Sequence, residues 1–232
     1  MNANNFDFSK LNFNFEKVTN DTYLKANKLQ SPMINDYDLL ETSLKLNMSS
    51  ESLDIQSKFL VYEKLNISGN DKYEYIFPQI DLTKKLNNNT RLNGDFIFET
   101  NNYIHNYDTN IYDRVNTNNL IFASIPKITK NGFYNNYEFL IKNSNTNAQN
   151  SKSFKNQENI YFSGLLQLNS SLPLMKENDK YKKITTPKLA LRIAPNHTKD
   201  NRNDNIKIDT SNIYSISRAT KQDFIEGGLS LT

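Results

Sequence analysis

Two histidines and their charged neighbours are the side chains whose types suggest acid–base or metal chemistry. His105 is close in sequence to Asp108, Asp113 and Arg114, in a stretch that we predict as a loop, and His197 falls in another predicted loop. An imidazole beside carboxylates can act as a general acid or base, and two histidines can share a metal ion. Catalysis also needs a pocket and supporting hydrogen bonds, which solvated loop residues lack. We therefore favour ordinary surface residues and predict no enzyme activity, no metal and no cofactor.

Three arginines, Arg192, Arg202 and Arg218, are the better candidates for a binding role. The planar guanidinium group is matched in shape and charge to phosphate and carboxylate groups. Arg218 can also pair with Asp223 or Glu226, and such a pair would pin the loop in which Arg218 lies. Phosphate contact and loop pinning are both open roles for these side chains.

The strand predicted at residues 188–194 positions the first of these arginines. Leu189, Leu191 and Ile193 fall on one face of this strand, and Arg192 falls on the other, because successive strand residues point to opposite faces. A proline brackets the strand on each side, where its missing N–H does not interrupt a sheet ladder.

The same period of two recurs along most of the chain, whereas a helical period does not. The alternating runs are Phe6–Phe15, Leu40–Met48, Leu53–Val61, Tyr73–Phe77, Leu92–Phe98, Leu120–Phe122, Tyr137–Ile141 and Ile160–Leu168. In the first run the alternation changes phase at Ser9 and Lys10, which predicts a bulge or turn there. The pattern predicts an all-β protein, an antiparallel meander of long strands with few helices.

Composition excludes several classes of protein. With 28 Lys and Arg against 25 Asp and Glu, the net charge of +3 and the interspersed charges argue against a nucleic-acid surface. The absence of cysteine excludes disulfides, thiolate metal sites and a cysteine nucleophile. The sequence contains no run of about 18 apolar residues, so it predicts no transmembrane helix. Residues 1–10 do not resemble a signal peptide, and the last residues stop within an alternating run, so we expect a fragment.

The predicted connections alternate between long and short, as they do in outer-membrane barrels. The long gaps are 20–37, 64–72, 101–117 and 144–157, and the short ones are 49–52, 87–90 and 129–132. The gap at 172–185 is of medium length and breaks this rule. Hydrocarbon cannot hydrogen-bond a free backbone, so β-structure spans a bilayer only as a closed barrel. The sequence therefore predicts a partial, open segment of a large transmembrane β-barrel.

Short segments in the same order resemble the outer-membrane lipopolysaccharide-assembly family LptD, also called organic solvent tolerance protein A (OstA). The richness of the chain in Asn, Lys and Ile resembles that of an alphaproteobacterial member. These segments are Thr19–Leu24, Tyr75–Pro78, Phe139–Asn143, Thr186–Asn196, Asn212–Arg218 and Asp223–Gly228. The resemblance covers nearly the whole chain and implies that residues 1–232 are one partial C-terminal barrel domain, from its early-middle to its central strands. The family's periplasmic N-terminal domain and its signal peptide would lie outside this chain.

The resemblance implies a role in inserting lipopolysaccharide into the outer leaflet of the outer membrane of a Gram-negative bacterium. Expected partners are lipopolysaccharide, outer-membrane lipid, an LptE-type lipoprotein plug and the proteins of the periplasmic transport bridge, but no nucleic acid. Arg192 would then point into the lumen, and Arg192, Arg202 and Arg218 would contact lipid A phosphates or pin the loop. Two alternatives stay open. One is a porin or receptor barrel of another family, and the other is a soluble cell-surface β-protein that binds glycans.

Overall fold

The strands account for most of the chain in the computed structural model. The structure describes residues 6–69, 71–88, 90–107, 110–151, 154–178, 181–195, 208–216, 218 and 228–232. Its elements are β1 (Phe8–Asn14), α1 (Tyr23–Ala26), β2 (Leu39–Ser50), β3 (Leu53–Lys64), β4 (Tyr73–Leu86), β5 (Gly94–Tyr107), β6 (Ile111–Ser124), β7 (Lys127–Ile128), β8 (Tyr134–Gln149), β9 (Asn159–Ser171), β10 (Leu174–Asn178), β11 (Tyr181–Thr185), β12 (Lys188–Ala194) and β13 (Gly228–Leu231). None of the described helices is of a length and hydrophobicity that would let it cross a membrane.

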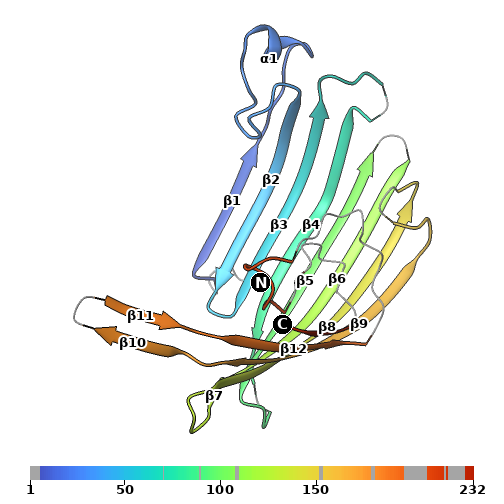
Figure 1. Cartoon of the computed structure of the whole chain (residues 1–232). Helices are drawn as coiled ribbons and strands as arrows, with labels where there is room; N and C mark the ends of the chain where they lie inside the picture. Colours follow the sequence, from blue (N-terminus) through green and yellow to red (C-terminus); the bar gives the residue numbers. More distant parts are fainter. Residues whose placement is uncertain are drawn as a thin grey trace. The chain divides into compact units, whose positions relative to one another are not determined.

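The main sheet follows the order of the chain. Its strands pair in the order β1-β2-β3-β4-β5-β6-β8-β9-β12-β13, with β7 beside β8, and β10 and β11 form a separate hairpin (Figure 1). Among the described strands β1 and β13 end this order, so the sheet is open there. The predicted all-β antiparallel meander is confirmed, and an open meander of long strands is consistent with part of a barrel.

The described residues divide into two compact units. Unit 1 comprises Met1–Lys84, Glu99–Asn118 and Ser144–Tyr161, and unit 2 comprises Lys85–Phe98, Asn119–Asn143 and Phe162–Thr232. In unit 1 the pairing register places Phe13, Leu44 and Phe59 in one cross-strand row and Asn12, Lys45 and Lys58 in the next. Because partners in register share a face, one face of this sheet is apolar and the other polar.

Unit 2 has the same two faces. Leu191 pairs with Leu168 and Ile193 with Leu166, and the alternate register positions join Arg192 to Gln167. We call the first set, with the Phe13 row of unit 1, the apolar face, and the second set, with the Lys45 row, the polar face.

Burial is inverted relative to a soluble β-protein, because many large apolar side chains of the apolar face are exposed. Ile160 is 78% exposed and Phe162 62%, whereas Gln167 and Arg192 on the polar face are 0% and 2% exposed. The buried clusters are correspondingly small. Leu140, Leu165 and Ala194 form one in unit 2, and Leu24, Leu40 and Leu65 form the other in unit 1.

Two of the predicted connections are wrong. The predicted loop at residues 101–117 is mostly strand, because β5 continues to Tyr107 and β6 begins at Ile111. The gap at 144–157 is likewise shortened, since β8 continues to Gln149. The predicted alternation of long and short connections therefore does not hold at these two places. The reason is that asparagine-rich segments, read as loops, pair as strands, with their amides bonded to one another across the sheet.

The predicted break at Ser9 and Lys10 is also wrong. β1 pairs with β2 without a register shift from Phe8 to Asn14, so no bulge or turn interrupts it. The continuous ladder satisfies the backbone groups of both residues, and the phase change in the sequence merely places Phe8 on the polar face. The medium-length gap at 172–185 holds the β10–β11 hairpin, which explains why it did not fit the predicted pattern of connections.

Gly94 provides a test of packing in unit 2. A Cβ at this position would meet the backbone oxygen of Ala123 and lie 2.6 Å from Cζ of Phe122, whose ring packs on Phe96. Gly94→Ala should therefore lower the free energy of unfolding by about 1–3 kcal/mol, as overpacking does. Denaturant unfolding followed by circular dichroism measures the change.

Gly164→Ala is the matched control, because its nearest contact for an added Cβ is Leu140 O at 3.9 Å. The control should leave stability within roughly 0.5 kcal/mol of wild type. Equal effects of the two substitutions would contradict the close packing of Phe122 on Gly94.

Candidate functional site

The polar face of unit 2 centres on Arg192 and Gln167. Strand alternation places both side chains opposite the leucines of β9 and β12, and the register of the two strands sets them side by side. Arg192 Nη1 donates to Gln167 Oε1 at 3.4 Å. A buried guanidinium is costly unless it is hydrogen-bonded, so the residues around it must supply acceptors.

A segment from the long connection between β12 and β13 supplies such an acceptor. Arg192 Nη1 donates to the Ser215 carbonyl at 3.1 Å, and Gln167 Nε2 donates to the Tyr214 carbonyl at 2.8 Å. The Tyr214 hydroxyl donates to the Lys188 carbonyl at 3.1 Å. We call residues 208–216 the inserted segment, because these contacts hold it against the polar face.

An apolar contact and a tight turn complete this arrangement. Ile216 packs against the cluster of Leu140, Leu165 and Ala194. At the other end, the Asp209 carboxylate accepts hydrogen bonds from the Ser211 hydroxyl and backbone N–H at 2.6 and 2.7 Å. These bonds, with that of Ser211 Oγ the largest contribution, hold the pKa of Asp209 below its ordinary value. The ionised carboxylate of Asp209 therefore stabilises this turn, and protonation in acid removes that contribution.

Arg218 lies beyond the inserted segment and is 5% exposed. Its Nη2 donates to Ser230 Oγ and to Thr232 Oγ1, each at 3.2 Å. Arg218 therefore ties its part of the connection to Ser230 on β13 and to Thr232 beyond it. The partners predicted for it, Asp223 and Glu226, lie outside the described residues.

The structure thus describes two of the three predicted arginines. Arg192 contacts the connection between β12 and β13 from β12, whereas Arg218 belongs to that connection and contacts Ser230 on β13. Arg202 lies outside the described residues, as do His197 and Asp108. The described contacts of Arg192 and Arg218 are those of a loop-pinning role. Their contact with phosphate stays a prediction.

The residues predicted as a histidine cluster in a loop lie on strands instead, His105 on β5 and Asp113 and Arg114 on β6. His105 is on a strand, with Nε2 2.8 Å from Glu74 Oε1 on β4. Asp113 and Arg114 are consecutive on β6 and so point to opposite faces. Within the described part of the chain, no group of three or more His, Cys, Asp or Glu side chains could hold a metal ion.

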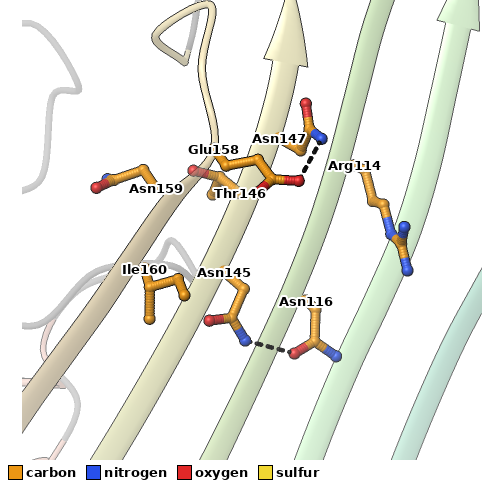
Figure 2. A pocket seen from close by; sticks show the side chains of 8 residues that line it. All are labelled: Arg114, Asn116, Asn145, Thr146, Asn147, Glu158, Asn159 and Ile160. Atoms are coloured by element: carbon orange, nitrogen blue, oxygen red, sulfur yellow. Dashed lines mark hydrogen bonds between the residues drawn. The ribbon is translucent and has the colours of Figure 1, made fainter.

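Sequence reasoning missed a row of asparagines in unit 1. Asn145 Nδ2 donates to Asn116 Oδ1 at 3.0 Å, and Asn147 Nδ2 donates to Glu158 Oε1 at 3.2 Å (Figure 2). Beside these bonds lies an open pocket of about 280 Å³, with Arg114 also in its lining. The signal was available in the sequence, since Asn143, Asn145 and Asn147 follow the strand period, but asparagine is ordinarily a turn residue.

Comparisons with known proteins do not assign the chain to a family. No protein-family model matches it, and no curated protein matches it either. Membership of the lipopolysaccharide-assembly family therefore stays a prediction from the sequence.

Removing the Arg192 guanidinium should release the inserted segment. In Arg192→Met the bond to the Ser215 carbonyl is lost, and a hydrogen bond to a charged group contributes about 1.5–3 kcal/mol. Amide hydrogen exchange in residues 208–216 should therefore quicken by roughly tenfold or more. Exchange read by mass spectrometry measures this.

Arg114→Met removes a guanidinium that is exposed on β6 of unit 1, and it should leave exchange in the inserted segment unchanged. If Arg192→Met also left that exchange at the wild-type rate, the pinning role of Arg192 would be refuted.

Proposed function

We propose that this chain forms part of the wall of an outer-membrane β-barrel, with its apolar face towards lipid and its polar face towards the lumen. The observation that carries the proposal is the inverted burial of the sheet. Ile160, Phe162 and Leu189 are mostly exposed on one face, whereas Arg192 is buried on the other. A soluble monomer rarely leaves so many apolar side chains in water, but a bilayer covers them.

Within that class, we favour transport of lipopolysaccharide to the outer leaflet. The support is the order of family-like segments along the sequence, together with a polar face that suits a sugar-containing cargo. The polar face would let hydrophilic sugars pass, while acyl chains remain against the apolar exterior. The family resemblance adds a lipoprotein plug in the lumen and a periplasmic bridge that supplies the energy. No bond is made or broken, so this role is not enzymatic.

The inserted segment also favours a second candidate, a porin or receptor barrel of another family. A loop held against the lumen face narrows the channel, which is a common way to select small solutes. The hydrogen bonds of Tyr214 and Ser215 to the polar face are compatible with this role. The soluble glycan-binding alternative is less favoured, because it would need a second layer to cover the apolar face.

Depleting the protein in the bacterium that encodes it separates the two barrel roles. If the protein inserts lipopolysaccharide, the amount reaching the cell surface should fall while the total amount in the envelope does not, because synthesis continues without export. Surface labelling with an impermeant probe, compared with whole-envelope extraction, measures this. Restoring the wild-type gene is the control.

Unchanged surface lipopolysaccharide would reject the transport role. A simultaneous fall in the uptake of small hydrophilic solutes would then favour the porin or receptor.

A further inference from the structure

Four amides of the asparagine row of unit 1, those of Asn102, Asn116, Asn118 and Asn145, form a hydrogen-bonded network across three neighbouring strands, and Asn147 beside them bonds to Glu158. We define the row as the side chains that follow the strand period on one face of β5, β6 and β8. Its members are Asn102, Asn116, Asn118, Asn145 and Asn147. Figure 2 shows Asn116 and Asn145 reaching towards each other from neighbouring strands, with the Asn147–Glu158 pair nearby.

Asn116 fixes the direction of the hydrogen bonds in the row. Its Oδ1 accepts from Asn118 Nδ2 at 2.7 Å and from Asn145 Nδ2 at 3.0 Å, and its Nδ2 donates to Asn102 Oδ1. Each amide carries two donors and an acceptor with two lone pairs. Amides that orient one another in this way present donors and acceptors at set positions, before any ligand arrives.

The lining of the pocket beside the row is mostly polar, which suits a polar ligand. Its volume of about 280 Å³ lies close to the lower end of the roughly 300–1,000 Å³ of small-molecule sites. Arg114 and Glu158, both exposed, contribute opposite charges to its lining, and Ile160 contributes the apolar surface. The polar residues of this lining can hydrogen-bond hydroxyl groups of a ligand, and Ile160 can pack against its C–H groups.

The row also lies where the side chains on this face of β8 change from apolar to polar. Along β8, Tyr137, Phe139 and Ile141 are followed, at the same alternate positions, by Asn143, Asn145 and Asn147. An amide facing hydrocarbon without partners costs about 4–8 kcal/mol on the cyclohexane scale. If the aromatic positions face lipid, as in the proposed function on which this step rests, the asparagine positions lie beyond the hydrocarbon, at the level of polar headgroups.

We propose that the pocket lined by Asn116, Asn145, Asn147 and Arg114 binds a saccharide, in the form of the sugar headgroup of a membrane glycolipid. Sugar hydroxyls both donate and accept hydrogen bonds, and the amides of the row match both functions. Ile160 contacts the C–H face of the sugar ring. The Arg114 guanidinium binds acidic groups on the same headgroup. The barrel would then hold its surrounding lipid by a specific contact on its outer wall.

The test uses the protein purified in detergent and titrated calorimetrically with the oligosaccharide that mild acid releases from lipopolysaccharide. The double variant Asn116→Leu with Asn145→Leu should bind at least tenfold more weakly, because it removes the centre of the amide network. Asn47→Leu is the matched control. Asn47 pairs with Gln56 on the polar face of β2 and β3, so this change should leave binding unaltered.

Two milder variants keep the test decisive if the double variant does not fold. Asn145→Ser shortens the side chain but keeps it polar, and Arg114→Gln alters an exposed residue. Both should weaken binding several-fold. Wild-type affinity in all of these variants, or no binding by the wild-type protein, would overturn the proposal.

Vesicles distinguish the source of the sugar. Vesicles of phosphatidylcholine that contain the glycolipid should compete with the oligosaccharide for the pocket, and vesicles of phosphatidylcholine alone should not. Binding of the free oligosaccharide without competition by the glycolipid would overturn the headgroup assignment. The outcomes also separate the two proposals. If depletion removes surface lipopolysaccharide but the pocket binds no saccharide, only this inference fails; the reverse result rejects only the transport role.

Discussion

The antiparallel pairing of the main-sheet strands in chain order is the constraint on which the structure depends. A continuous antiparallel ladder satisfies the backbone N–H and C=O groups within the sheet, and it forces alternate side chains to opposite faces. The sheet can therefore be apolar on one side and polar on the other with no second layer. Phe59 and Lys58, consecutive on β3, fall in the apolar and polar rows respectively. The difference between the two faces is the basis for proposing that the sheet lies in a membrane.

The polar face explains why residues 208–216, part of the connection between β12 and β13, lie against the sheet. A guanidinium that is 2% exposed, that of Arg192, needs acceptors, and the inserted segment provides the Ser215 carbonyl. In return, Arg192 and Gln167 satisfy backbone carbonyls of a segment that forms no strand pairing of its own there. The strand and the segment therefore stabilise each other. Removing one partner leaves a buried polar group unsatisfied, which costs more than the bond itself contributes.

The strand period was predictable because it is local, and it correctly placed Leu189 and Arg192 on opposite faces. The predicted loop at residues 101–117 was wrong. It was predicted because asparagine favours turns by propensity. Tertiary context overrode that propensity, because Asn102 and Asn116 bond across neighbouring strands. The partners of Arg192 were also out of reach of sequence reasoning. Ser215 is distant along the chain, and no local pattern shows that its carbonyl faces a guanidinium.

The most direct test of the account is the environment of consecutive residues on one strand. Because the chain has no cysteine, single cysteines at Leu44 and Lys45, and at Leu189 and Lys188, can each carry one fluorophore. In outer-membrane vesicles, a nitroxide attached to lipid acyl chains should quench the labels at Leu44 and Leu189, and a water-soluble quencher should reach those at Lys45 and Lys188. Equal quenching by the aqueous agent at all four positions, with none by the lipid nitroxide, would contradict a membrane-spanning sheet.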